Sequence, residues 1–253
     1  MLRIKADMHI HTVLSPCGDL DMSPRNILIK AKEKGLDLIA ITDHNSTLMC
    51  RVIANLASEY DIAVIPGVEI TTKEEAHCLA YFHDYEQINQ IQMFLEQHLP
   101  PIQNNPDLFG HQLVVDQDEM ILQEINTLLI TALNLSIDEI EKTVHKIGGI
   151  FIPAHIDRPK YSIISQLGFI PFDLNAEAFE LSRYSSPDSF TAQNKPYRNF
   201  IYVQNSDAHY LENIADAYTI FEIENPTLEE IVKALKNLDG RKIVSTHNQR
   251  KTN

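Results

Sequence analysis

The chain has 253 residues, of which 44% are hydrophobic and 22% charged, so it can bury a sizeable core without disulfides or a structural metal. Its formal net charge of −14 disfavours nucleic acid as a partner, because that contact needs Lys and Arg facing phosphates. No apolar run reaches the roughly eighteen residues of a membrane span, and the N-terminus lacks the apolar stretch of a signal peptide. Three cysteines without a Cys-x-x-Cys pair fit a reducing compartment. We therefore expect a cytoplasmic protein without a membrane partner.

The first half of the chain alternates short apolar runs with helical patterns. Repeated strand–helix–strand units of this kind predict a parallel sheet. The expected strands are residues 4–10, 36–42, 62–65 and 77–82, and the expected helices are residues 24–35, 48–59 and 86–98.

Residues 100–119 break this alternation. Their prolines, asparagines and a glycine predict a loop-rich excursion over one end of the domain. Helical periodicity then returns at residues 119–133. Neither a repeat nor a linker divides the chain, so residues 1–253 are predicted to form a single domain. The remaining expected elements are helices at 136–148, 162–167 and 227–238 and strands at 150–153, 176–181 and 200–204.

Metal-binding residue types gather at the ends of the predicted strands. Five strands each place His, Asp or Glu at or beside one end, and four of them do so just past the carboxyl end, where parallel α/β folds build their sites. His9 and His11 are two apart on one strand, so both imidazoles share a face. Imidazole and carboxylate ligands together suit zinc, iron or manganese. The residues concerned are His9, His11, His44, Glu69, His77, His155, Asp207 and His209.

Five short segments resemble, in order, the motifs of one known family. DMHIHT, ITDHN, IPGVEIT followed by HCLAYF, PAHIDRP and NSDAH resemble those of the PHP family, the polymerase-and-histidinol-phosphatase superfamily. The resemblance spans residue 4 to about residue 225. It implies a distorted (β/α)7 barrel with a metal centre at the carboxyl ends of the strands. It also implies three divalent transition metals per chain, which would be zinc, iron or manganese.

Carried over position by position, the resemblance implies three ligand groups that share one carboxylate. Glu69 is the shared group, because it bridges the first and second metals. His9, His11, Glu69 and Asp207 surround the first metal, His77 and His155 complete the second, and His44 and His209 hold the third.

The segment after the His-x-His pair departs from the family pattern. Many relatives read Ser-Asp-Gly here and use that Asp for the third metal, whereas this chain has the longer SPCGDLDMSP. Counting back from Pro24 places Asp19 at the ligand position, and counting forward from His11 places Cys17 there. Asp19 is preferred, because a hard oxygen ligand suits a hydrolytic centre exposed to oxidants. Cys17 stays open, because thiolate is a good zinc ligand.

Such a centre predicts hydrolysis of a phosphate ester. Metals about 3.5–4 Å apart can share a hydroxide, so that no serine or cysteine nucleophile is needed. Asp7 and Asp43 adjoin ligating histidines, and each is predicted either to orient an imidazole or to cap a turn. Arg158 follows His155 closely and is predicted to bind the substrate phosphate through paired hydrogen bonds.

The expected substrate is a small phosphomonoester, such as a sugar, histidinol or nucleotide phosphate. One alternative is an exonuclease-type phosphodiesterase, like the PHP modules attached to bacterial polymerases. The other is a non-catalytic, metal-binding regulatory module. The regulatory module ranks last, because degenerate modules lose ligands and every expected ligand position here is filled.

Overall fold

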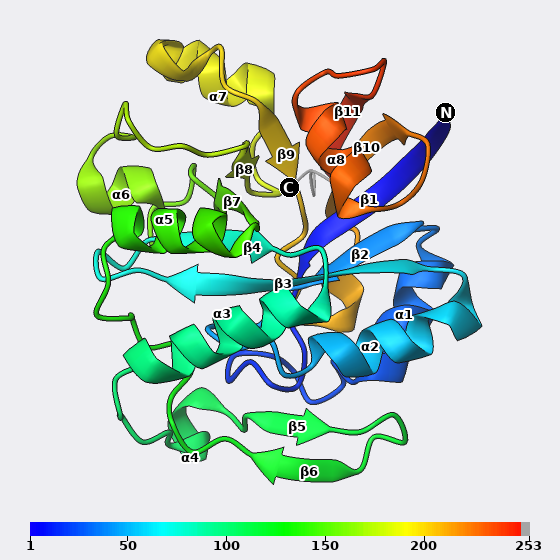
Figure 1. Ribbon diagram of the computed structural model, residues 1–253, viewed down its shortest axis with the longest axis vertical. Helices are drawn as coiled ribbons and strands as arrows, with labels where there is room; N and C mark the ends of the chain where they lie inside the picture. The colour runs from blue at the N-terminus through cyan, green and yellow to red at the C-terminus, as the bar shows by residue number, and fades with distance from the viewer. Residues whose placement is uncertain (249–253) are drawn as a thin grey trace.

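A curled, mixed sheet forms the centre of the molecule (Figure 1). The computed structural model describes residues 1–248. The strand order in the seven-stranded sheet is β11-β10-β1-β2-β3-β4-β7. Its strands are β1 (Leu2–Ile10), β2 (Leu38–Ile41), β3 (Ala63–Thr71), β4 (His77–Tyr81), β7 (Ile150–Pro153), β10 (Ala217–Ile223) and β11 (Lys242–Asn248).

Helices and two small sheets surround this sheet. β5 (Leu113–Val115) and β6 (Ile121–Glu124) form a hairpin, and β8 (Phe179–Leu181) pairs in parallel with β9 (Tyr202–Gln204). The α-helices are α1 (Pro24–Glu33), α2 (Cys50–Ala57), α3 (Tyr85–His98), α4 (Pro106–Phe109), α5 (Ile137–Ile147), α6 (Ile163–Leu167), α7 (Pro187–Gln193) and α8 (Leu228–Leu235). The 3₁₀ turns are η1 (Ser58–Tyr60), η2 (Lys195–Tyr197) and η3 (Leu211–Asn213).

The central strands are apolar throughout because both of their faces are buried. In β2, Ile39 and Ile41 belong to the cluster that includes α1 and α2, whereas Leu38 and Ala40 belong to the cluster that includes α8. A strand covered on both faces reads as a continuous apolar run rather than an alternating one. The mixed α/β fold with its curled sheet agrees with the distorted barrel that the resemblance implies. Within the described residues, no helix is both long and apolar enough to cross a membrane.

The direction of β4 differs from the expected parallel pattern. β1, β2 and β3 are parallel, as predicted, but β4 runs antiparallel to both β3 and β7. The connection between β3 and β4 is a short turn, and parallel strands need a crossover of roughly a dozen residues or more. His77 therefore opens β4 directly opposite Thr71, the last residue of β3. An amino end of one strand thus meets the carboxyl ends of its neighbours.

β3 is longer than predicted. It continues through Pro66 and Gly67 to Thr71, so Glu69 lies inside the strand instead of following it. Pro-Gly usually marks a turn, but here the missing side chain of Gly67 allows close packing. A Cβ atom added at Gly67 would lie only 2.9 Å from the carbonyl oxygen of Ala80 in β4.

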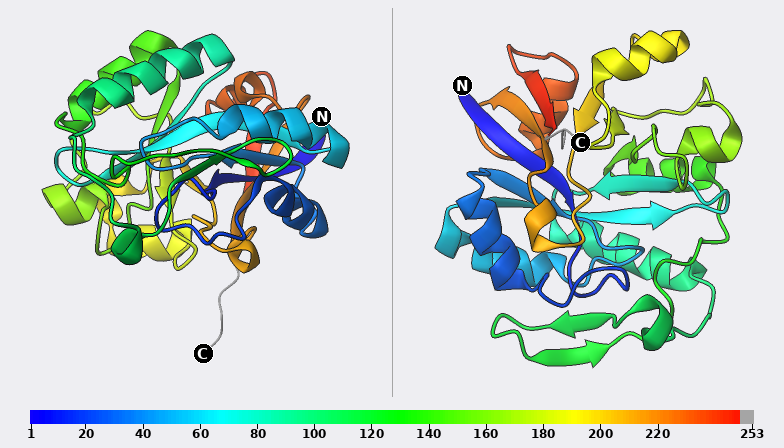
Figure 2. Two further views of the ribbon diagram at one scale, coloured as in Figure 1. Left: turned by 90° about the horizontal axis from the view of Figure 1, so that it is seen from below. Right: turned by 180° about the vertical axis from the view of Figure 1, so that it is seen from behind.

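The helix expected at residues 119–133 is wrong. These residues include β6 of the hairpin, which extends from one end of the molecule in Figures 1 and 2. Asp116 explains the difference, because its Oδ1 accepts hydrogen bonds from the backbone N–H groups of Asp118 and Met120. Glu119 between them has a left-handed backbone, with φ of 62°. Local turn chemistry therefore outweighs the apolar periodicity.

The C-terminal part of the sheet was missed by sequence reasoning. β10 pairs antiparallel with β1, and β11 pairs with β10. β10 shows strict alternation of buried and half-buried residues, which is the period expected of a strand with one covered face. The short strands expected at 176–181 and 200–204 are shorter still, as β8 and β9.

Gly67→Ala should lower the free energy of unfolding by about 1–3 kcal/mol, because the new methyl group would overlap the β4 backbone. Urea unfolding followed by circular dichroism measures this loss. Gly168→Ala is the control, since nothing lies within 4 Å of its added Cβ. Its left-handed backbone should cost about 1 kcal/mol. Equal losses in the two variants would contradict the packing argument.

Candidate metal centre

The carboxyl ends of several strands and the start of β4 bring the predicted ligands together. His9 lies one residue before the end of β1, Glu69 lies near the end of β3, and His77 opens β4. Loops after β1, β2, β7 and β9 supply the rest. Isolated parallel bridges between Ile10 and Ala208 and between His44 and Glu69 hold these loops against the sheet. The loop ligands are His11, His44, His155, Asp207 and His209.

The first predicted group has the spacing of a single metal site. The Nε2 atoms of His9 and His11 lie 3.2 Å apart, and each lies 3.3 Å from Oδ1 of Asp207. Each also lies 3.3 Å from one oxygen of Glu69. Ligands at 2.0–2.1 Å around a tetrahedral ion would be separated by about 3.3–3.4 Å. The group therefore fits the first coordination shell of one ion, with one donor atom from each of the four residues.

Glu69 joins this group to the other histidines. Its side chain is 1% exposed, and its Oε1 lies 2.9 Å from Nδ1 of His77 and 3.1 Å from Nε2 of His155. Its Oε2 lies 3.1 Å from Nδ1 of His44. The predicted bridging position is thus occupied by a carboxylate that has imidazoles against both oxygens.

Within residues 1–248, three buried polar atoms in this centre have no aligned hydrogen-bond partner, although two of them lie 3.1 Å apart. They are Oε2 of Glu69, Nδ1 of His44 and Nδ1 of His155. Buried polar atoms are normally paired, because leaving one unpaired costs about 1–3 kcal/mol. A cation between Glu69 and His44 would satisfy two of these atoms at once. The residues present therefore fit bound metal ions.

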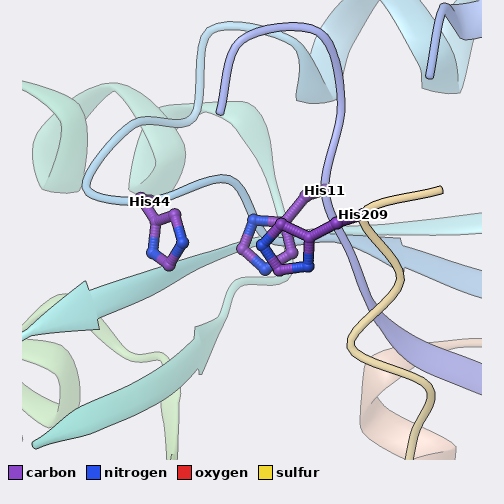
Figure 3. A group of neighbouring side chains, drawn as sticks. All are labelled: His11, His44 and His209. Atoms are coloured by element: carbon purple, nitrogen blue, oxygen red, sulfur yellow. The ribbon is translucent and has the colours of Figure 1, made fainter. Parts of the chain in front are cut away.

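The third predicted group, His44 and His209, lies beside His11, which the prediction assigned to the first group. Figure 3 shows their rings together, each from a different loop. The ring centres of His11 and His209 are 4.0 Å apart, and those of His11 and His44 are 4.5 Å apart. One ring nitrogen from each lies within 4.8 Å of the others. The chain thus offers three imidazole ligands at this position.

Asp19 and Cys17 lie on the loop beside the third group. In the described part of the chain, neither contributes an atom to the three compact ligand groups. The Asp19 carboxylate accepts a hydrogen bond from the backbone N–H of Asp21. The backbone N–H of Asp19 donates to the carbonyl oxygen of His209. Cys17 is exposed to solvent. Desolvation, followed by the charges of Glu69 and Asp207, raises the pKa of its thiol. The choice between the two residues stays a prediction.

Asp7 holds a ligand-bearing loop. Its Oδ1 accepts the backbone N–H of Ser206 at 3.0 Å, and its Oδ2 accepts that of Ala215 at 2.9 Å. Complete burial raises its pKa to about 6, although these hydrogen bonds oppose the shift. Ser206 precedes Asp207, so Asp7 fixes the loop that presents this candidate ligand. The two oxygens of Asp7 thus bind backbone N–H groups, which is the kind of contact that the turn-capping alternative predicted.

Asp43 reaches an imidazole through a hydroxyl group. Its Oδ1 accepts hydrogen bonds from Thr12 N–H and from Ser15 Oγ, both at 2.7 Å. Ser15 Oγ in turn lies 2.9 Å from Nδ1 of His11. Asp43 can therefore orient His11 only indirectly. Ser15 was not singled out in the sequence, where a serine four residues after a histidine carries no distinctive signal.

Glu180 is the main residue that sequence reasoning missed. It is 1% exposed, and both of its oxygens lie 3.1 Å from Nδ1 of His9. The sequence carries one signal for Glu180, because it is a single carboxylate inside the short apolar strand β8. A buried charge is usually paired, so such a residue is expected to have a partner.

Arg158 lies at the edge of the centre. Its Nη1 is 2.5 Å from Oδ2 of Asp207, and its side chain is 29% exposed. It also lines a cavity of about 630 Å³ together with Tyr184, Phe190 and Gln193. The guanidinium is therefore held by a candidate ligand and faces an open space beside the centre.

The protonation states of three candidate ligands suit metal binding, whereas neighbouring carboxylates raise the pKa of His9 and His11 despite their burial, so a metal ion would displace a proton from each. Burial alone would raise the pKa of Glu69, but the charges of His77 and His9 lower it well below its usual value. Burial lowers the pKa of His44 well below its usual value, and that of His209 to about 4. Metal ligands must be anionic carboxylates and neutral imidazoles, and these three residues meet that requirement.

Two candidate ligands have an uncommon backbone conformation. His155 has φ of 29° and Asp207 has φ of 52°, both in the left-handed region that non-glycine residues rarely adopt. Such strain persists where the surrounding structure fixes it, and it is frequent at functional sites.

Two known proteins have sequences similar to this chain. The uncharacterized protein YqxK of Bacillus subtilis is 27% identical over 280 aligned positions, which cover 98% of this chain and 65% of that protein. The uncharacterized protein MJ1587 of Methanocaldococcus jannaschii is 42% identical over 79 residues, or 28% of this chain and 46% of that protein.

Among solved structures, the lesion-specific endonuclease EndoQ of Pyrococcus furiosus has a TM-score of 0.71 at 22% identity, over 98% of this chain and 59% of that one. A proposed metal-dependent phosphoesterase of Bifidobacterium adolescentis has a TM-score of 0.59 at 19% identity, over 81% of this chain and 87% of that one. At these identities the likeness establishes the fold. The chain spans less than two thirds of the length of YqxK and EndoQ.

These structures correct one expectation. Net charge was expected to disfavour nucleic acid as a partner, and that exclusion is wrong. Endonuclease Q, with a TM-score of 0.72 over 98% of this chain and 60% of that one at 21% identity, is solved with a 27-mer duplex that has an abasic lesion at the active site. The physical reason is that bound cations change the local field, so net charge does not determine the potential at a metal centre.

Family models agree with the resemblance noted in the sequence. The model of the PHP domain matches residues 7–208, and a PHP-associated model matches residues 198–239. The first match covers most of the chain and includes every residue of the first two ligand groups. On this evidence, the chain belongs to the PHP domain family.

Proposed function

We propose that this protein hydrolyses phosphate esters with a cluster of up to three divalent transition-metal ions. The observation that carries the proposal is the first ligand group, in which the Nε2 atoms of His9 and His11 lie 3.2 Å apart and each lies 3.3 Å from an oxygen of Asp207 and from an oxygen of Glu69. When bound, such ions polarise phosphoryl oxygens, offset charge in the transition state and lower the pKa of water. The PHP domain match supports the same activity.

The protein's own groups would then hold the ions and the phosphate. Glu69 lies between the ligand groups and would bridge two ions. Arg158 is anchored to Asp207 through Nη1, and its remaining N–H groups could donate to phosphate oxygens from the side of the adjoining cavity. Asp43, through Ser15, would keep the His11 ring in place.

Two substrate classes are supported by different observations. The likeness to Endonuclease Q over 98% of the chain favours a phosphodiester in a nucleic-acid strand. The cavity of about 630 Å³ that Arg158 lines has the size of a small-molecule site, and it favours a small phosphomonoester. Both use the same metal centre, so a substrate assay separates them.

Metal-loaded protein should therefore hydrolyse at least one of these ester classes. The assay compares sugar phosphates, nucleoside monophosphates, and single- and double-stranded DNA with and without an abasic site. Elemental analysis of protein purified without chelator should show more than one transition-metal ion per chain, and a chelator should remove the activity. One ion or none would reject the trinuclear centre. Fully loaded protein that is inactive on every ester would reject the phosphoesterase proposal.

Glu69→Gln should lower activity by at least about 100-fold and reduce the number of bound ions. An amide cannot bridge two cations as a carboxylate does, and loss of even an indirect partner of a metal costs 10–100-fold. Elemental analysis and steady-state kinetics measure the two effects. Glu141→Gln is the control, since Glu141 is a buried carboxylate that pairs with His145 on α5. Normal turnover in Glu69→Gln would show that the bridging position is misassigned.

Asp19→Ala and Cys17→Ala distinguish the two possible third-site ligands. We expect Asp19→Ala to lose about one metal equivalent and most of the activity, because a missing direct ligand weakens one ion selectively. Cys17→Ala should retain its metals. Elemental analysis of both variants under one purification protocol is the measurement. The reverse pattern would assign a thiolate site, favour zinc there and predict inactivation by oxidants.

A further inference from the structure

One buried carboxylate behind the centre contacts two candidate ligands at once. Glu180 is the middle residue of β8 and is 1% exposed. Its oxygens lie 3.1 Å from Nδ1 of His9, and its Oε2 accepts the backbone N–H of His155 at 2.9 Å. Its Oε1 accepts a hydrogen bond from Nδ2 of Asn205 at 2.8 Å. Two oxygens therefore receive donors from three separate segments.

We propose that Glu180 is a positioning residue that orients His9 and His155 for metal binding. This inference rests on the proposed metal centre. With Nδ1–H of His9 donating to Glu180, the lone pair of the imidazole is at Nε2. Nε2 is the atom of His9 that lies 3.2–3.3 Å from the other donors of the first group. Carboxylates that fix the tautomer of a ligating histidine in this way also raise its basicity.

The site requires a group that only accepts hydrogen bonds. Oδ1 of Asn205 accepts the N–H of Met8 at 2.8 Å, so Asn205 must present its NH₂ group to Glu180. The N–H of His155 is a fixed backbone donor. Glutamine at position 180 would turn its own NH₂ group toward one of these donors. An ionised carboxylate has acceptor capacity for all three contacts, and an amide does not.

The same carboxylate links the first and second ligand groups. His155 is held at φ of 29°, and its Nε2 lies 3.1 Å from Oε1 of Glu69. By binding the N–H of His155, Glu180 supports this strained backbone while it also orients His9. The third group has separate supports, since Ser15 Oγ accepts the backbone N–H of His44 and the carbonyl of His209 accepts the N–H of Asp19.

Glu180→Gln should therefore weaken two of the bound ions by 10–100-fold and leave the third unchanged. Competition with a chelator measures the affinities, and elemental analysis measures the number of ions. Glu177→Gln is the matched control. Glu177 also pairs with a histidine, His145, at 3.2 Å and accepts a backbone N–H, that of Phe151, at 2.8 Å, but it lies outside the ligand groups. The control should bind metal like the wild-type protein.

Thermal unfolding in excess chelator separates positioning from folding, because a positioning role predicts a larger change in metal affinity than in metal-free stability. Glu180→Asp retains the charge but withdraws the oxygens by one methylene group, so it should weaken the same two ions less than Glu180→Gln. Wild-type affinities in both Glu180 variants, or equal losses in Glu177→Gln, would overturn the inference. A wild-type protein that binds no metal would instead overturn the proposed function.

Discussion

The burial of Glu69 is the constraint on which the centre depends. A carboxylate that is 1% exposed is strongly unfavourable as an anion unless charges or hydrogen-bond donors compensate it. Here the compensation comes from imidazoles, and they keep the pKa of Glu69 well below its usual value despite the burial. These imidazoles come from different strands and loops, so the strand ends must converge for Glu69 to remain ionised. The architecture of the sheet and the chemistry of the site therefore have the same requirement.

The sheet meets this requirement with a change of direction. If β4 were parallel to β3, His77 would lie at the opposite edge of the sheet. The short turn after Thr71 makes the pair antiparallel and places His77 across from the end of β3. Gly67 lets β4 approach closely just before Glu69. Local backbone properties of this hairpin thus set the distance between a candidate bridging carboxylate and one of its histidines.

A second layer of carboxylates surrounds the candidate ligands, and its members act in different ways. Asp7 binds backbone N–H groups of the loop that carries Asp207, whereas Asp43 acts on His11 through Ser15. Glu180 contacts an imidazole directly. A rigid ligand set of this kind reduces the reorganisation needed when ions and phosphate bind. The charge of the cations that this ligand set would hold explains how a chain with a net charge of −14 can present a site suited to an anionic substrate.

The sequence by itself determined which strand ends carry ligand-type residues, because strand periodicity and the motifs around His9, His44 and Glu69 are local. It also predicted most elements of the first half, including β1, β2 and α3. The residues of β6 were predicted to form a helix, but the turn that the Asp116 side chain stabilises outweighed the apolar periodicity. Tertiary structure alone decided the direction of β4, the strands β10 and β11, and the role of Glu180. Glu180 meets His9 across 171 positions of the chain, and a pairing over that separation depends on packing that no local pattern encodes.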